Sequence, residues 1–144
     1  MSQESTTPDL VELVRRSFEA ANRGDMNATL SDFGPDSVWD DSAIGLGTHE
    51  GLAAIRAHYR EWIGAYEEFA VEAEEILDLG HGVVFVVALQ KGRPVGSTGQ
   101  VQLRYATVAV WAEGTTKRFT TYTDIDEARA AAERLVHERA QADA

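Results

Sequence analysis

The feature that most constrains the fold of this chain is a change in its hydrophobic period near Phe69. Beyond this residue, apolar and polar side chains alternate, and a two-residue period is typical of β-strands. Glycine-containing connections at 80–82 and 113–114 are typical of tight turns between antiparallel strands. The second half of the chain therefore predicts an antiparallel sheet, with strands at residues 69–79, 83–91, 99–112 and 115–123.

The first half of the chain has a helical period instead. Leu10, Val14 and Phe18 recur at steps of four, which indicates an amphipathic helix that ends at Gly24. A short helix capped by Asp25 and carrying Met26, Leu30 and Phe33 is expected next, followed by a strand at 37–41. A third helix has Thr48 as its N-cap, and its apolar face carries Leu52, Ile55, Tyr59, Trp62 and Tyr66. A last helix starts near Asp124.

The order of these elements is α-α-β-α-β-β-β-β-α, which predicts an α+β fold with helices on one face of a curved sheet. A chain of 144 residues is long enough for one domain with a buried core. We expect a disordered N-terminus at 1–8, a folded domain at 9–137 and a C-terminal tail at 138–144.

Charge and composition exclude several classes of function. The chain has 24 acidic residues and 13 Lys and Arg residues, so its net charge is −11, which argues against nucleic acid and anionic membrane surfaces as partners. It has no cysteine, which excludes disulfides and thiolate chemistry. Neither a secretory signal nor a membrane span is expected, so we predict a cytoplasmic protein. No pair of the four histidines has metal-ligand spacing, and we expect no metal or other cofactor.

Several short runs of residues share the pattern of one known family. They are Asn-Arg-Gly-Asp at 22–25 after the helix at 11–18, Val-Trp-Asp at 38–40, Gly-Thr-His-Glu-Gly at 47–51, and Tyr-Thr-Asp at 122–124 followed by Glu-Ala at 127–128. Together they resemble the SnoaL-like proteins of the nuclear transport factor 2-like superfamily, over residues 9–136.

This resemblance implies a cone-shaped, cystatin-like roll, in which a strongly curved antiparallel sheet wraps around a long helix. It also implies an apolar pocket for a small molecule at one end of the cone, and a homodimer formed through the sheet. Members of the superfamily include polyketide cyclases, ketosteroid isomerases, dehydratases and limonene epoxide hydrolases, so the fold alone does not fix the reaction.

Asp40 is the first candidate catalytic residue, because the resemblance places the general base of ketosteroid isomerases there. A carboxylate in an apolar pocket loses solvation, which raises its pKa and suits it to take a proton from carbon. The alternative is that Asp40 and Asp41 form a solvated pair at the end of a strand. Adjacent strand residues face opposite sides, so only one of the two can face the pocket, and we favour Asp40.

Other candidates follow from the same resemblance. Ser17 and Thr107 fall near the two oxyanion-holding positions of ketosteroid isomerases, and because neither is a tyrosine or an acid, that activity is not expected. Asp124 and Tyr122 lie where SnoaL-like cyclases carry an acid on a late strand. The alternative for Asp124 is an N-cap of the last helix, since Glu127 follows at capping-box spacing.

Arg104, with Asp40 and Asp124, could imitate the activating trio of limonene epoxide hydrolases, but Ala106 stands where those enzymes carry an acid. The alternative places Arg104 on a solvent or dimer face. His49, next to the pocket loop, could shuttle protons or could be a surface residue, and its nine-residue separation from His58 predicts different sides of one helix.

Large aromatic residues are expected to line the pocket and to favour a flat ligand, with Trp39, Tyr59 and Trp62 as candidates. Ser17, Thr107, Thr121 and Tyr122 could supply hydrogen bonds to it. The sequence thus predicts a cofactor-free cyclase, isomerase or dehydratase acting on an apolar, polyketide- or steroid-like carbonyl compound, with Asp40 as the base and Tyr122 or a threonine as the hydrogen-bond donor. The alternatives are a non-catalytic binding or assembly module of the same fold and an epoxide hydrolase.

Overall fold

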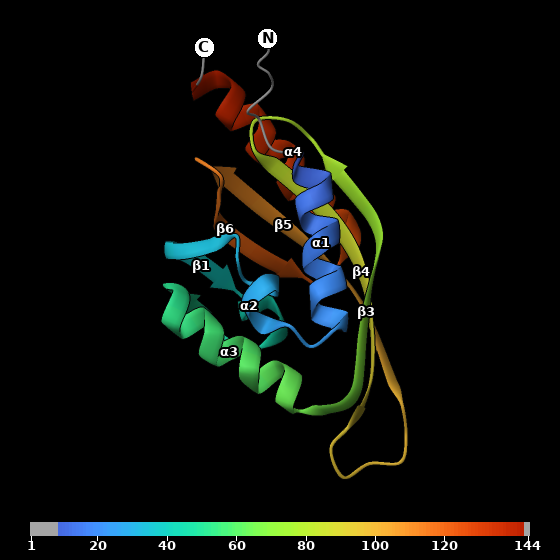
Figure 1. Cartoon of the computed structure of the whole chain (residues 1–144). Coiled ribbons are helices and arrows are strands. Elements are labelled where there is room, and N and C mark those ends of the chain that lie inside the picture. The colour runs from blue at the N-terminus through green and yellow to red at the C-terminus, as the bar shows by residue number, and fades with distance from the viewer. Residues whose placement is uncertain (1–8, 143–144) are drawn as a thin grey trace.

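The structure, a computed structural model, describes residues 9–142 and confirms the α+β cone (Figure 1). Its six strands form one curved sheet in the order β2-β1-β6-β5-β4-β3. The expected N-terminal segment 1–8 lies outside the described residues, as do 143–144. The elements are α1 (Leu10–Asn22), α2 (Met26–Thr29), β1 (Phe33–Asp40), the 3-10 turn η1 (Ser42–Ile44), β2 (Thr48–Glu50), α3 (Leu52–Gly64), β3 (Tyr66–Asp78), β4 (Val83–Pro94), β5 (Val101–Ala112), β6 (Thr115–Tyr122) and α4 (Ile125–Ala142).

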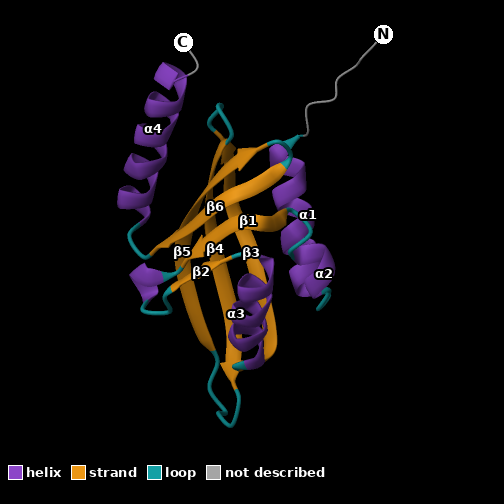
Figure 2. Ribbon diagram, turned by 90° about the vertical axis from the view of Figure 1, so that its left-hand side faces the viewer, coloured by secondary structure: helices purple, strands orange, loops and turns teal. Residues whose placement is uncertain are grey.

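The helices lie on both faces of the sheet, which corrects the expectation of one helical face (Figure 2). On β4, Val84 and Val86 belong to a core that packs against α1. Phe85 and its odd-numbered neighbours face the other way and pack against Ala128 and Ala132 of α4. Because both faces are covered, residues 83–88 are all buried, and this run is apolar throughout instead of alternating.

Two features of the sheet differ from the predicted strands. Residues 48–50 form β2, which pairs antiparallel with β1, so α3 begins at Leu52 and not at Thr48. β1 itself begins at Phe33, which was expected in the second helix, and it pairs in parallel with β6. The pairing of β1 with β6 depends on a partner far away in the sequence, and β2 is only three residues long, whereas the helical pattern is local, and this explains why the sequence misplaced both boundaries.

The helix ends follow the expected capping chemistry in part. Asp25 caps α2, since its Oδ1 accepts a hydrogen bond from the Ala28 N–H at 3.0 Å. Gly24 has a φ of 76°, as a residue that ends a helix often does. α4 continues to Ala142, so residues 138–142 extend the last helix.

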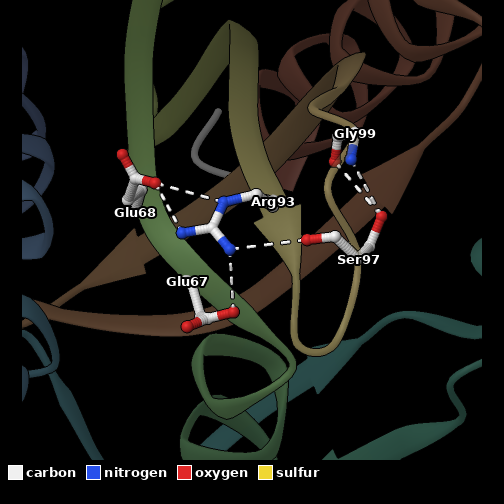
Figure 3. A network of polar contacts seen from close by, with 5 residues as sticks. All are labelled: Glu67, Glu68, Arg93, Ser97 and Gly99. Atoms are coloured by element: carbon white, nitrogen blue, oxygen red, sulfur yellow. Dashed lines mark hydrogen bonds and ion pairs between the residues drawn. The ribbon is translucent and has the colours of Figure 1, made fainter.

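A polar network ties β3 to the loop that follows β4 (Figure 3). The Arg93 guanidinium donates to Glu68 at 2.6 Å and 3.1 Å and to Glu67 at 3.0 Å. It also donates to the Ser97 carbonyl oxygen at 3.4 Å. This end of the cone is therefore held by side-chain contacts in addition to the strand pairing.

Candidate functional site

A cavity of about 120 Å³ lies between the concave face of the sheet and the first three helices. Its walls come from α1, α2, β1, η1, α3, β3, β5 and β6, and none of its described lining residues comes from β2, β4 or α4. Most of the lining is apolar. The aromatic side chains among the lining residues include Phe18, Trp39, Tyr59, Trp62, Tyr105 and Phe119.

The carboxyl group at this cavity belongs to Asp41, the first residue after β1. Asp41 is 4% exposed and His58 on α3 is 6% exposed. Their atoms Oδ2 and Nε2 are 2.6 Å apart, so the two side chains are hydrogen-bonded. A buried acid and a buried imidazole therefore share one proton position beside an apolar cavity.

Strand alternation and helical spacing explain why these two side chains point inward. Asp41 follows Trp39 by two residues, so it continues the side of β1 that carries an aromatic residue into the cavity. His58 follows Ile55 by three residues and precedes Trp62 by four, which places it on the buried stripe of α3. Both signals are present in the sequence, and the sequence analysis missed them.

Three polar groups at the cavity have no hydrogen-bond partner among residues 9–142. Oδ1 of Asp41 and Nε1 of Trp39 are buried without one. No described residue donates to or accepts from the Tyr105 hydroxyl on β5. Because unpaired buried polar groups cost free energy, a bound molecule that supplies partners would stabilise this arrangement.

The two tyrosines at the cavity stay protonated. Burial raises the pKa of Tyr105, and the nearby Asp41 charge raises it further. Burial also raises the pKa of Tyr59, while a hydrogen bond with Thr29 partly opposes this shift. Both hydroxyls are therefore hydrogen-bond donors at any physiological pH.

His49 contacts the Asp41–His58 pair through the His58 ring. Its ring stacks on that of His58, with centroids 3.9 Å apart and an interplanar angle of 13°. This corrects the expectation that the two histidines face different sides, because His49 belongs to β2 and not to the helix. Its Nε2 lies 2.8 Å from the Leu46 carbonyl oxygen, so it also holds the loop that follows η1.

Asp40 does not line the cavity, so the expectation that it faces the pocket is wrong. Its carboxylate accepts hydrogen bonds from the hydroxyl and backbone N–H of Ser42, from Thr48, and from Arg118 at 2.8 Å. The two Ser42 hydrogen bonds are the main reason why the pKa of Asp40 is lowered, with smaller contributions from Thr48 and Arg118. The expected direction was the opposite, because we expected an apolar environment.

Four other candidates lie outside the cavity lining. Asp124 caps α4, since its Oδ1 accepts from the Glu127 N–H at 3.0 Å. Tyr122 packs against the core on the α4 side of the sheet. Thr107 is buried on β5 but does not line the cavity. Arg104 binds Glu74 through two hydrogen bonds of 2.7 and 2.9 Å. The trio of Asp40, Arg104 and Asp124 is therefore not brought together.

The curved sheet and the order of its elements agree with the comparisons to known proteins. Residues 14–119 match the SnoaL-like domain. The chain belongs to this SnoaL-like family. Comparison with curated proteins gives no match.

Solved structures share the fold of this SnoaL-like chain. An NTF2-like protein of unknown function from Burkholderia pseudomallei K96243 matches with a TM-score of 0.70 and 25% identity, over 84% of this chain and 95% of its own. TerC, co-crystallised with polyporic acid, matches with a TM-score of 0.67 and 20% identity, over 85% and 97%. SalBIII, described as an epoxide hydrolase/cyclase-like enzyme, matches with a TM-score of 0.68 and 20% identity, over 79% and 89%.

Five candidate ligand-binding residues of the SnoaL-like chain do line the cavity: Ser17, Trp39, Tyr59, Trp62 and Thr121. Two of them already have protein partners. The Ser17 hydroxyl donates to the Thr29 carbonyl oxygen at 3.2 Å, and Trp62 Nε1 donates to Gln90 at 3.0 Å. Their remaining contribution to a ligand is therefore mainly the surface of the side chain.

Within residues 9–142, no group of three or more histidine and acidic side chains is arranged to hold a metal ion. None of the helices in that range is both long enough and apolar enough to cross a membrane.

Proposed function

We propose that this SnoaL-like protein is a general acid/base enzyme that converts an apolar carbonyl compound without a cofactor. The observation that carries the proposal is the buried pair of Asp41 and His58 at an apolar cavity, with one carboxylate oxygen left unpartnered. A base in such a site is shielded from water and retains one oxygen for the substrate. Asp41 thus takes the role that the sequence suggested for Asp40.

In the proposed reaction, Asp41 takes a proton from the carbon next to the substrate carbonyl, and the electron pair of that C–H bond forms an enolate. Isomerisation returns the proton to another carbon. In cyclisation, the enolate carbon attacks a second carbonyl group of the same molecule, and the oxygen of that group takes the proton from Asp41. In dehydration, the enolate expels a β-hydroxyl group, which takes the proton from Asp41 and leaves as water. All three reactions begin with the same proton transfer, which general bases accelerate by about 10²–10⁴-fold.

His58 acts in this scheme as a positioning residue. Its Nε2 binds Oδ2 of Asp41 at 2.6 Å, so the carboxylate keeps one orientation and the other oxygen stays available. A proton on this pair can reside on either atom, and the hydrogen bond persists in both states. The pair can therefore hold the substrate proton until it is returned.

The structural relatives support a small-molecule role. TerC was co-crystallised with polyporic acid, and SalBIII has a role in pyran ring formation in the polyether salinomycin. A non-catalytic binding module remains the alternative, because the same cavity could bind a ligand without converting it. Epoxide hydrolysis is not pursued, since Arg104 is bound to Glu74 away from the cavity.

The experiment is hydrogen–deuterium exchange at carbon. The protein is incubated in D₂O with small ketones, and NMR measures deuterium uptake next to the carbonyl. We expect Asp41→Asn to lower the exchange rate by at least about 100-fold. Asp40→Asn is the matched control, because the sequence alone favours Asp40 as the base, whereas the structure places it outside the cavity lining. We expect this variant to exchange at the wild-type rate.

Two further variants separate positioning from folding. His58→Gln retains a hydrogen-bond donor, whereas His58→Leu retains none. We expect His58→Gln to keep part of the exchange rate with an altered pH profile, and His58→Leu to lose most of it. If ligands raise the melting temperature but no exchange occurs in wild-type protein, the binding-module alternative is correct. Loss of exchange in Asp40→Asn but not in Asp41→Asn would refute the assignment of the base.

A further inference from the structure

Resting on the proposed function, we infer that the substrate places one uncharged ring with a carbonyl group in this cavity, and that the Tyr105 hydroxyl donates a hydrogen bond to that carbonyl. This goes beyond the polyketide- or steroid-like class that the resemblance implies, because it limits both the size and the charge of the group that is bound.

The volume of the cavity sets the size. An apolar cavity of about 150 Å³ holds one benzene molecule, whereas pockets for drug-sized ligands measure about 300–1,000 Å³. At about 120 Å³, this cavity has room for one ring. A four-ring compound does not fit inside this volume, and the walls are packed aromatic side chains such as Trp39 and Phe119, whose ring centroids lie 4.5 Å apart.

The charges around the cavity exclude an anionic ligand. None of the described residues that line it is a lysine, an arginine or a histidine, and one is an aspartate. A ligand carboxylate or phosphate would lose its hydration beside Asp41 without gaining a cationic partner from the walls. The net charge of −11 also repels anions approaching from solution.

The unpartnered donors argue against a simple ammonium ion as the ligand. Aromatic walls and one carboxylate could attract a cation, but the Trp39 indole N–H and the Tyr105 hydroxyl both need an acceptor. An ammonium group offers only donors, so it would leave both groups unpaired. A carbonyl oxygen supplies an acceptor, and a neutral ring fits the apolar walls.

Tyr105 can serve catalysis as well as binding, because the Asp41 charge acts on its hydroxyl. It comes from β5, and Asp41 follows β1, so the two groups reach the cavity from different strands of the sheet. Burial keeps the Tyr105 hydroxyl protonated by raising its pKa. When Asp41 removes a proton from the carbon next to the carbonyl, negative charge develops on the carbonyl oxygen, and the hydrogen bond from Tyr105 stabilises it.

The test compares small probes by thermal shift and by NMR titration of the whole protein. The probes are cyclohexenone and acetophenone as neutral single rings, progesterone as a four-ring ketone, and benzoate and benzylamine as charged single rings. We expect only cyclohexenone and acetophenone to raise the melting temperature and to saturate at millimolar concentration. Tyr105→Phe should weaken acetophenone binding by about five- to tenfold, since it removes one hydrogen bond.

Tyr66→Phe is the matched control, because Tyr66 lies on β3 outside the cavity lining, and we expect it to leave the affinity unchanged. Binding of progesterone, benzoate or benzylamine as tightly as acetophenone would overturn the inference, and so would the absence of binding by both neutral rings. Single-ring binding without deuterium exchange would refute the proposed function and leave this inference standing. Deuterium exchange on progesterone would support the proposed function and refute this inference.

Discussion

Replacing His58 with leucine is expected to destabilise the protein strongly, because it leaves the Asp41 carboxylate buried without its partner. The two side chains are 4% and 6% exposed, and the atoms that bond are 2.6 Å apart. Removing one member of such a buried pair typically costs about 3–5 kcal/mol.

For a domain of this size, the loss corresponds to a fall in melting temperature of roughly 10–15 °C. Asp41→Leu leaves the His58 imidazole without its partner and should cost less, about 1–3 kcal/mol. The double variant Asp41→Leu/His58→Leu removes both polar groups, and the adjoining cavity accepts the added volume at position 41. We expect its stability to lie within about 1 kcal/mol of wild type.

The assay is urea denaturation followed by tryptophan fluorescence at pH 7, with all four proteins in one thermodynamic cycle. The single-variant losses should sum to several kcal/mol more than the loss in the double variant. A cost below about 1 kcal/mol for His58→Leu, or losses that simply add, would refute the reasoning, because a buried charged pair must show coupling.

The remaining predictions concern stability and assembly. Folding lowers the pKa of Asp40, so its carboxylate stabilises the fold at any pH above its pKa in the unfolded state. This contribution is lost as the pH falls through the pKa of Asp40 in the folded state. Asp40→Asn should therefore cost about 1 kcal/mol at pH 7, and its urea midpoint should converge with that of wild type in acid. Gly82→Ala should cost about 3 kcal/mol or more, because φ is 79° and the new Cβ would clash with the Trp111 carbonyl oxygen. Gly80→Ala is the control: its φ is 88°, but its Cβ would have no atom within 4 Å. It should cost about 1–2 kcal/mol in the same denaturation assay. Asp124→Ala removes the cap of α4 and should lower stability by about 1 kcal/mol, and an unchanged melting temperature would contradict that role. We also expect the homodimer through the sheet that the family resemblance implies, and a monomer mass by light scattering at micromolar concentration would count against this.

The fold could be predicted from the sequence because its main signals are local. The two-residue alternation after Phe69 and the helical spacing before it fix the kinds of elements and their order. The exceptions have a common cause. β2 is only three residues long, and the parallel pairing of β1 with β6 joins segments far apart in the chain, so no local pattern marks either.

The candidate site was only partly predictable, for a related reason. The family resemblance implied a cavity, and Trp39 and Trp62, which we expected to line it, do so. The sequence also indicated that only one acid of the pair after Trp39 can face inward. The structure shows that the alternation of β1 continues one residue beyond the strand, so Asp41 faces the cavity on the same side as Trp39. Asp40 faces away and is bound by Ser42 and Thr48.

What the sequence determined by itself, therefore, is an α+β chain with strongly apolar strands, no thiol chemistry and a large negative charge. Only the tertiary structure decided that Asp41 meets His58, 17 residues further on, and that Tyr105 reaches the same cavity from another strand. The physical reason is that a hydrogen bond between buried groups requires close contact and exclusion of water. Both conditions are set by the packing of α3 and the register of the sheet, not by the spacing of residues along the chain.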